Sequence, residues 1–202
     1  MQLNELKAAL EAMLFASDDP QPLKRLEEVF EGTDQGVVEK ALRELEQEYS
    51  SADRGTKIIE VAGGFQMCTK PQLRSHVERL FEKRRRSRLS GPALETLAIV
   101  AYKQPITRGE IEVIRGVNVD GVTHSLLERG FIKIGGRKEV PGRPFLYRTT
   151  KNFLEHFGLR NLKDLPAIEE LSDAFKQSQA EPPEETESTN PETSPEVHSD
   201  TD

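Results

Sequence analysis

The stretch from Leu89 to Arg148 constrains the fold most strongly, because signals for three helices and a hairpin follow one another there with almost no spacer. Ser90 can cap a first helix, and Pro92 fits its first turn because the fixed φ of proline suits a helix. The helix is expected to end between Tyr102 and Pro105. Its apolar face is predicted to consist of Leu94, Leu97, Ala98 and Ala101.

A second helix is predicted after Thr107, because Thr107 and Glu110 have the spacing of a capping box. It carries Ile111 and Ile114, and Gly116 can end it in a left-handed conformation. A third helix is expected to begin near Asn118 or Asp120, to bury Val122, Leu126 and Leu127, and to end at Gly130.

Two β-prone runs follow the helices, Phe131 to Ile134 and Phe145 to Arg148. Gly135-Gly136 allows the positive φ angles of a turn, and Pro141-Gly142 interrupts the return path. Three helices packed on a small hairpin make a winged-helix domain, the helix-turn-helix variant in which the hairpin is the wing.

The first half repeats this order of elements about 85 residues earlier in the chain. Its hairpin is predicted from Lys57 to Val61 and Phe65 to Thr69, turned by Ala62-Gly63-Gly64, and Pro71 to Phe81 is expected to form a closing helix. The predicted fold class is therefore mainly α with small β-hairpins (α+β), built from tandem winged-helix domains.

Charge divides unevenly along the 202 residues. Residues 1–82 carry −6, residues 83–166 carry +9, and residues 167–202 carry −10. We predict a first winged-helix domain at 1–82, a basic linker at 83–88, a second winged-helix domain at 89–166 and an acidic disordered tail at 167–202. The tail either serves solubility or folds back on the basic second domain, whose charge is the main argument for a polyanionic partner.

No motif for catalysis or for a cofactor or metal is evident. Gly135 to Lys138 lacks the Ser or Thr and the glycine spacing of a phosphate-binding loop, and the four histidines are scattered. The single cysteine, Cys68, is expected to be a half-buried strand residue. No apolar run approaches the roughly 20 residues that cross a bilayer, so we expect a cytoplasmic protein that is not an enzyme.

Winged-helix domains bind either DNA or protein, and the charges leave both open. The third helix of the second half offers Asp120, Thr123, His124, Ser125 and Glu128 to solvent, and that of the first half offers Glu39, Glu44, Glu46 and Glu48. Phosphates would be repelled by such helices. The basic residues of the wing are Lys133, Arg137, Lys138, Arg143 and Arg148, which suit either DNA or an acidic protein segment.

Several blocks of the sequence resemble the segregation and condensation protein B family, a bacterial partner of the structural-maintenance-of-chromosomes ATPase. The blocks are Leu94 to Arg108 with Glu110-Ile111 and Arg115-Gly116-Val117, then Gly135-Gly136-Arg137, Pro141 to Tyr147, Phe153 to Leu159, Asp164-Leu165-Pro166, and in the first half Ala12 to Ser17. The resemblance implies tandem winged-helix domains in a nucleoid-associated, non-enzymatic scaffold that dimerises through its first domain. It also implies binding to the kleisin, segregation and condensation protein A. The alternative is a winged-helix transcription regulator.

Within the second domain, the candidate kleisin-binding residues are Tyr102, Arg108, Arg137, Arg143 and Tyr147. Tyr and Arg dominate the energetics of many protein interfaces, and turns hold these residues near the surface. Other roles are open: Tyr102 can cap the core, Arg108 can pair with Glu112, and Arg143 can brace the wing.

The dimerisation candidates are Leu3, Leu6 and Leu10, which form one apolar stripe at helical spacing. A small domain with such a stripe has surface that a second copy can cover. The same stripe equally fits an ordinary core.

Overall fold

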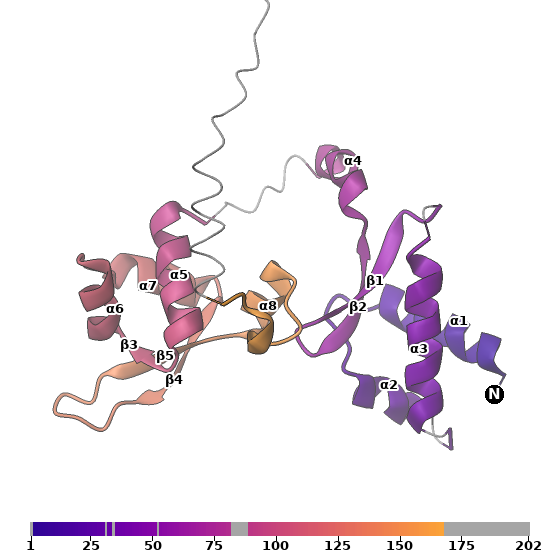
Figure 1. The fold of residues 1–202 in the computed structure, drawn as a ribbon, viewed down its shortest axis with the longest axis horizontal. Coiled ribbons are helices and arrows are strands. Elements are labelled where there is room, and N and C mark those ends of the chain that lie inside the picture. The colour runs from indigo at the N-terminus through magenta and orange to yellow at the C-terminus, as the bar shows by residue number, and fades with distance from the viewer. Residues whose placement is uncertain (1, 31, 34, 52, 82–88, 168–202) are drawn as a thin grey trace, which may run out of the picture. The chain divides into compact units, whose positions relative to one another are not determined.

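The computed structural model describes residues 2–30, 32–33, 35–51, 53–81 and 89–167 (Figure 1). The predicted linker at 83–88 lies outside these ranges, as do all but the first residue of the predicted tail. The elements of the first half are α1 (Leu3–Phe15), α2 (Leu23–Val29), α3 (Gln35–Tyr49), β1 (Thr56–Val61), β2 (Gly64–Thr69), the 3-10 helix η1 (Pro71–Leu73) and α4 (Arg74–Leu80).

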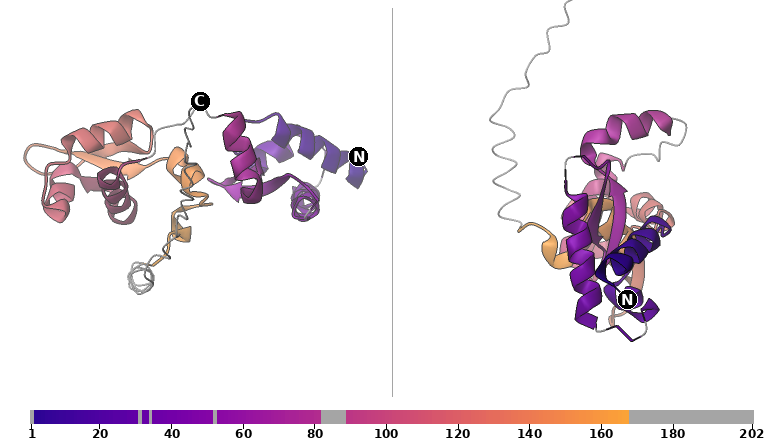
Figure 2. Two further views of the ribbon diagram at one scale, coloured as in Figure 1. Left: turned by 90° about the horizontal axis from the view of Figure 1, so that it is seen from above. Right: turned by 90° about the vertical axis from the view of Figure 1, so that its right-hand side faces the viewer.

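Helix α1 crosses α3, packs against it and supplies much of the first core (Figure 1 and Figure 2). Leu6, Leu10 and Leu14 are fully buried because they recur every four residues and therefore face one side of the helix. The Gln2 backbone N–H donates to the Glu5 carboxylate at 3.0 Å, which satisfies one free donor at the start of α1.

The hairpin of the first half turns within the predicted segment, but its turn has two residues, Ala62 and Gly63, because Gly64 is already the first residue of β2. Ala62 (φ 51°) and Gly63 (φ 76°) both have positive φ, and Val61 pairs with Gly64. This is the turn geometry that matches the twist of a hairpin. Gly64 also permits a close approach, because a Cβ there would lie 2.7 Å from the backbone carbon of Gln21. The predicted closing helix differs slightly, since it begins with the 3-10 turn of η1.

The second half repeats the order with one additional strand. Its elements are α5 (Gly91–Lys103), β3 (Ile106–Thr107), α6 (Arg108–Arg115), α7 (Asp120–Glu128), β4 (Ile132–Arg137), β5 (Phe145–Thr149), α8 (Lys151–Phe157) and the 3-10 helix η3 (Leu162–Asp164). The winged-helix prediction is confirmed in both halves.

The predicted helix caps of the second half are confirmed. The Ser90 hydroxyl accepts from the Ala93 N–H, Thr107 and Glu110 form a complete capping box, and Gly116 ends α6 with φ 69°. Three predicted apolar positions were wrong: Ala98 is exposed, Leu94 is 44% exposed and Ile114 is 53% exposed. The face of α5 that is buried instead consists of Ala93, Thr96, Leu97, Val100 and Ala101.

The wing differs from the prediction in its turn. Gly135-Gly136 does not turn the chain but lies inside β4, at a shift of register between Ile134 and Gly136. The strand therefore continues to Arg137, which pairs with Phe145, and the turn lies beyond it. A Cβ at Gly135 would lie 2.8 Å from the Arg148 side chain, so a larger residue there would require that side chain to move. Glycines in a strand can mark a bulge as well as a turn, and the sequence alone did not separate the two.

Strand β3 was not predicted, because two residues give no periodic pattern. It pairs with β5, so that the second sheet has the order β3-β5-β4. The side chain of Gln104, just before β3, also binds β5. Its oxygen accepts from the Thr149 N–H at 2.9 Å, and its amide nitrogen donates to the Thr149 hydroxyl at 3.0 Å. In the first half an isolated bridge between Gln21 and Phe65 occupies the corresponding place.

The buried apolar residues form two separate clusters. One contains residues from Leu6 to Phe65, and the other contains residues from Ala93 to Phe153. Two cores are what two small domains require. The domain boundaries at 82, 88 and 166 stay predictions.

Candidate partner-binding surfaces

The wing carries five exposed residues that we call the wing surface: Lys133, Arg137, Arg143, Phe145 and Arg148. Within this group, Arg137 is held in place from two sides. Its Nη1 donates to the Arg143 carbonyl oxygen at 3.1 Å, and its guanidinium carbon lies 4.2 Å from the centre of the Phe145 ring. A guanidinium has five N–H donors, so Arg137 remains able to bind an anion while its orientation is fixed.

Arg143 lies at the tip of the wing with a positive φ of 39°. Its backbone carbonyl holds Arg137, and its N–H donates to the Val140 carbonyl oxygen at 2.9 Å. The guanidinium group forms no ion pair with a described residue. Arg143 thus both braces the wing, as one alternative proposed, and presents a cation to solvent.

Lys133 and Arg148 are direct partners across β4 and β5. Both side chains are exposed, and the described residues supply no ion pair to either. Like charges at opposing positions of an antiparallel pair destabilise the sheet. An acidic partner would remove this repulsion. The opposition of Lys133 and Arg148 could not be predicted from a turn at Gly135-Gly136, because the register of a hairpin depends on where its turn lies.

Glu110 links α6 to the wing. Its Oε1 accepts from Lys138 Nζ at 2.5 Å, and its Oε2 accepts from the Thr107 N–H and hydroxyl, each at 2.8 Å. The Lys138 hydrogen bond, followed by those from Thr107, lowers the pKa of Glu110 from 4.5 to about 2. Lys138 is therefore neutralised by Glu110 and is not part of the wing surface.

The structure brings Arg137 and Arg143 together and places the other three candidates elsewhere. Tyr147 is only 8% exposed and belongs to the second core. Tyr102 is half-buried on the last turn of α5. Arg108 forms an ion pair with Asp120 and lies 4.0 Å from Glu112, so the predicted alternative role in pairing is present.

Helix α7 presents little that would bind phosphate. His124 Nε2 lies 3.3 Å from Glu128 Oε1, and Asp120 pairs with Arg108. Thr123 was predicted to face solvent, but it is 2% exposed, and its hydroxyl has no partner among the described residues.

In the first half, Glu44 and Glu48 of α3 pair with Lys7 at 3.2 and 2.6 Å, and the hydrogen bond to Glu48 is the main cause that raises the pKa of Lys7.

The dimerisation candidates on α1 separate into two groups. Leu6 and Leu10 are 1% and 0% exposed and belong to the first core, as the alternative reading proposed, whereas Leu3 is 38% exposed. The outward face of α1 instead carries Ala8, Ala12 and Phe15, which lie near one another at helical spacing. Phe15 is 81% exposed, which no stripe of leucines could indicate.

A second apolar patch lies on α6 and the loop after it. Val113, Ile114 and Val117 are 84%, 53% and 54% exposed. The helix itself is anchored by Arg115, which donates to the Pro92 carbonyl oxygen and the Thr96 hydroxyl, each at 2.8 Å. The sequence pattern had assigned Ile114 to the core side of this helix.

The part of the chain that the structure describes contains no group of three or more His, Cys, Asp or Glu residues arranged to hold a metal ion. Cys68 is half-buried in β2 as expected, and burial raises the pKa of its thiol. Among the described helices none is long and apolar enough to cross a bilayer.

Residues 8–168 match the model of the protein family described as segregation and condensation complex subunit ScpB. A protein from Moorella thermoacetica named segregation and condensation protein B is 48% identical over 169 residues, which cover 84% of this chain and 86% of that protein. The protein of the same name from Syntrophotalea carbinolica is 46% identical over 180 residues, which cover 89% and 90%.

Solved structures are similar as well. The crystal structure of ScpB from Mycobacterium tuberculosis is 36% identical, covers 79% of this chain and 98% of that chain, and has a TM-score of 0.39. A structure described as a dimer of the ScpB N-terminal domain complexed with an ScpA peptide is 29% identical, covers 39% and 96%, and has a TM-score of 0.37.

Proposed function

This chain belongs to the segregation and condensation complex subunit ScpB family, and we propose that it is a non-enzymatic scaffold subunit of a condensin-like complex. In this proposal it binds the kleisin, segregation and condensation protein A, and through it acts with the structural-maintenance-of-chromosomes ATPase at the nucleoid. The family and the names of its relatives support a role in chromosome segregation and condensation. The kleisin contact is the part that requires a site.

We place that contact on the wing surface, and the unrelieved pairing of Lys133 with Arg148 carries the proposal. Two cations fixed opposite each other favour a ligand with carboxylates. Arg137 is already oriented by Phe145 and by the Arg143 carbonyl, so little side-chain freedom is lost on binding. Phe145 adds apolar area beside the charges, as is common at protein interfaces.

Dimerisation is the second part of the proposal. We place it on the outward face of α1, where Phe15 is exposed beside Ala8 and Ala12. Small residues allow two helices to approach closely, and a two-fold arrangement would pack each Phe15 against the alanines of the other copy. Leu6 and Leu10 support this face from the core, and they do not form it.

A DNA-binding regulator is the competing function, because a basic wing also suits phosphates. Helix α7 argues against it, since its exposed positions include Asp120 and Glu128. Arginine or amide side chains that read base edges would be expected at those positions in a sequence-specific regulator.

The experiment compares kleisin and DNA binding by two double charge reversals of the wing surface, Arg137→Glu with Arg143→Glu and Lys133→Glu with Arg148→Glu. Lys151→Glu is the matched control, because Lys151 is an exposed cation on α8, outside the wing. Affinities for purified segregation and condensation protein A and for a DNA duplex are measured at low and high salt.

We expect each double reversal to weaken kleisin binding by at least about tenfold, because opposite charges become like charges at the contact, while the control changes it little. The opposite result would be an unchanged kleisin affinity together with loss of a DNA affinity that depends steeply on salt in the wild type. It would show that the wing surface binds DNA, as expected of a transcription regulator. Unchanged affinity for both would place the kleisin elsewhere, and the α1 variants described below would then be tested for it.

A further inference from the structure

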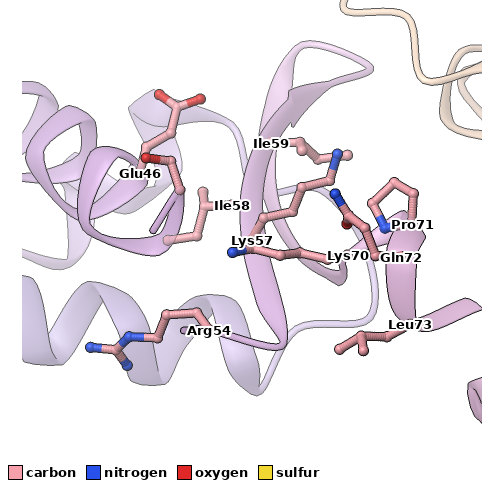
Figure 3. Close-up of a pocket in the computed structure, with 10 residues that line it drawn as sticks. Glu46, Arg54, Lys57, Ile58, Ile59, Lys70, Pro71, Gln72 and Leu73 are labelled. Carbon is pink, nitrogen blue, oxygen red and sulfur yellow. The ribbon is translucent and has the colours of Figure 1, made fainter. Parts of the chain in front are cut away.

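The first half contains a groove along the unpaired edge of β1 that neither the wing surface nor α1 uses (Figure 3). Its volume is about 830 Å³, within the range of small ligand sites. Figure 3 places Glu46 of α3 on one side of the β1 ribbon and Pro71 and Leu73 of η1 on the other. The complete lining is Glu46, Ser50, Arg54, Lys57, Ile58, Ile59, Lys70, Pro71, Gln72 and Leu73.

The floor of this groove is a strand edge that ends where the Ala62 N–H donates to the Leu159 carbonyl oxygen at 2.9 Å. Strand β1 pairs only with β2 in the described sheet. Because the two-residue turn makes Val61 and Gly64 a hydrogen-bonded pair, the same holds for Ile59 and Lys57 with their partners. The N–H and C=O groups of Ile58 and Glu60 therefore point away from β2. Such an edge is a template for an added strand.

The walls of the groove are cationic. Arg54, Lys57 and Lys70 line it, against one carboxylate, Glu46, which already lies 3.2 Å from Arg43. Arg54 is oriented by the Tyr49 ring, 4.7 Å away, and Lys70 donates to the Ser51 carbonyl oxygen. Lys57 has no ion-pair partner among the described residues. The net positive charge lies directly beside the free strand edge.

The apolar part of the lining distinguishes a peptide from a nucleic acid. Ile59, Pro71 and Leu73 are aliphatic, and Leu73 is 38% exposed. The described lining residues include no aromatic side chain on which a base could stack. Aliphatic contacts beside a strand edge fit the alternating side chains of an extended peptide.

We propose that this groove binds an extended acidic segment of a partner protein, which adds as a strand to the free edge of β1. Backbone groups of Ile58 and Glu60 pair with the segment, Lys57 and Arg54 bind its carboxylates, and the aliphatic wall accepts the side chains between them. The site lies in the first half and does not depend on the wing surface, so either proposal can fail without the other.

The test uses the full chain and a fluorescent peptide of about eight residues, the length of an ordinary strand, in which Glu and Val alternate. One control peptide alternates Lys and Val. A second control carries N-methyl groups on alternate residues of the Glu–Val peptide, which removes the donors for strand pairing but keeps every charge. Binding is followed by fluorescence anisotropy, and folding of each variant by circular dichroism.

Two variants locate the site. Lys57→Glu reverses a cation inside the groove, and Lys40→Glu is its matched control, an exposed lysine on α3 outside the groove. We expect Lys57→Glu to lower the affinity for the Glu–Val peptide about tenfold, as for loss of a close charge pair at an interface. Lys40→Glu should change this affinity by less than about twofold.

Hydrogen exchange supplies a readout that charge alone would not move. With the Glu–Val peptide bound, we expect the amides of Ile58 and Glu60 to exchange at least about tenfold more slowly, because they acquire acceptors. Equal effects of Lys57→Glu and Lys40→Glu would overturn the proposal, as would equal binding of the N-methylated peptide. A single-stranded oligonucleotide that binds through Lys57 while the peptide does not bind would assign the groove to nucleic acid instead.

Discussion

Lys133 and Arg148 face each other across the β4–β5 hairpin with no described carboxylate between them. The Arg148 side chain also lies over Gly135, where a Cβ would approach it to 2.8 Å. The bulge in β4 therefore fixes both the register that opposes the two cations and the position of one of them. A repulsive pair held this firmly is a local cost to the fold of the wing.

Replacing one of the two cations should therefore stabilise the fold of the second half and at the same time weaken its binding to the kleisin. We expect Lys133→Glu to raise the free energy of unfolding by about 0.2–1 kcal/mol, because repulsion becomes attraction. Lys133→Gln, which only removes repulsion, should give a smaller gain. Urea denaturation measures both, and a loss of stability in Lys133→Glu would contradict the account of the wing surface.

Glu110 should make stability depend on pH at the acid end. Its folded pKa of about 2 lies below the ordinary 4.5, so the carboxylate contributes stability that is fully present above pH 4.5 and lost as the pH falls towards 2. Glu110→Gln keeps an acceptor for the capping box but loses the charge opposite Lys138.

The test of Glu110 is the difference in unfolding free energy between wild type and Glu110→Gln, measured from pH 7 downwards. We expect it to be small, because the side chain is 44% exposed, and to shrink below about pH 4.5. Lys138→Gln should show the same trend. A difference that grows on acidification would contradict the lowered pKa.

Three glycines should respond to alanine in different ways. Gly64→Ala should cost more than about 2 kcal/mol, because its Cβ would meet the Gln21 backbone at 2.7 Å. Gly116→Ala, with φ 69° but open space around it, should cost about 1–2 kcal/mol. Gly109→Ala, in open space within α6, should stabilise by about 0.5–1 kcal/mol. Thermal denaturation ranks them, and any other order would contradict these backbone arguments.

Phe15→Asp should abolish dimerisation without unfolding the first half, because Phe15 is 81% exposed and contributes little to the core. Leu10→Asp is the contrasting variant, since it buries an unpaired charge in that core and should unfold it. Light scattering at tens of micromolar measures the mass, and circular dichroism measures folding. A folded Phe15→Asp dimer would exclude the α1 face.

Calorimetry with ATP and magnesium should show no saturable heat for the isolated chain. The reason is chemical, since the sequence offers no glycine-rich phosphate loop followed by Lys and Ser or Thr. Saturable binding by the pure protein would overturn the non-enzymatic part of the proposed function.

Local signals in the sequence determined the elements and their order. Thr107 with Glu110, Ser90 with Pro92, and Gly116 act within a few residues of themselves, so the caps of α5 and α6 could be predicted without tertiary structure. The repeated order of three helices and a hairpin, and with it the winged-helix fold, followed from the same kind of signal.

The tertiary structure decided which faces of these elements are buried and how the strands pair. Leu94, Ile114 and Thr123 lie on the opposite side from the one predicted, because a stripe on a short helix does not say which neighbour covers it. Gly135-Gly136 allows a bulge and a turn equally, and only pairing with β5 selects the bulge. The opposition of Lys133 and Arg148, the exposure of Phe15 and the open edge of β1 all depend on such packing between distant residues, which the sequence does not specify locally.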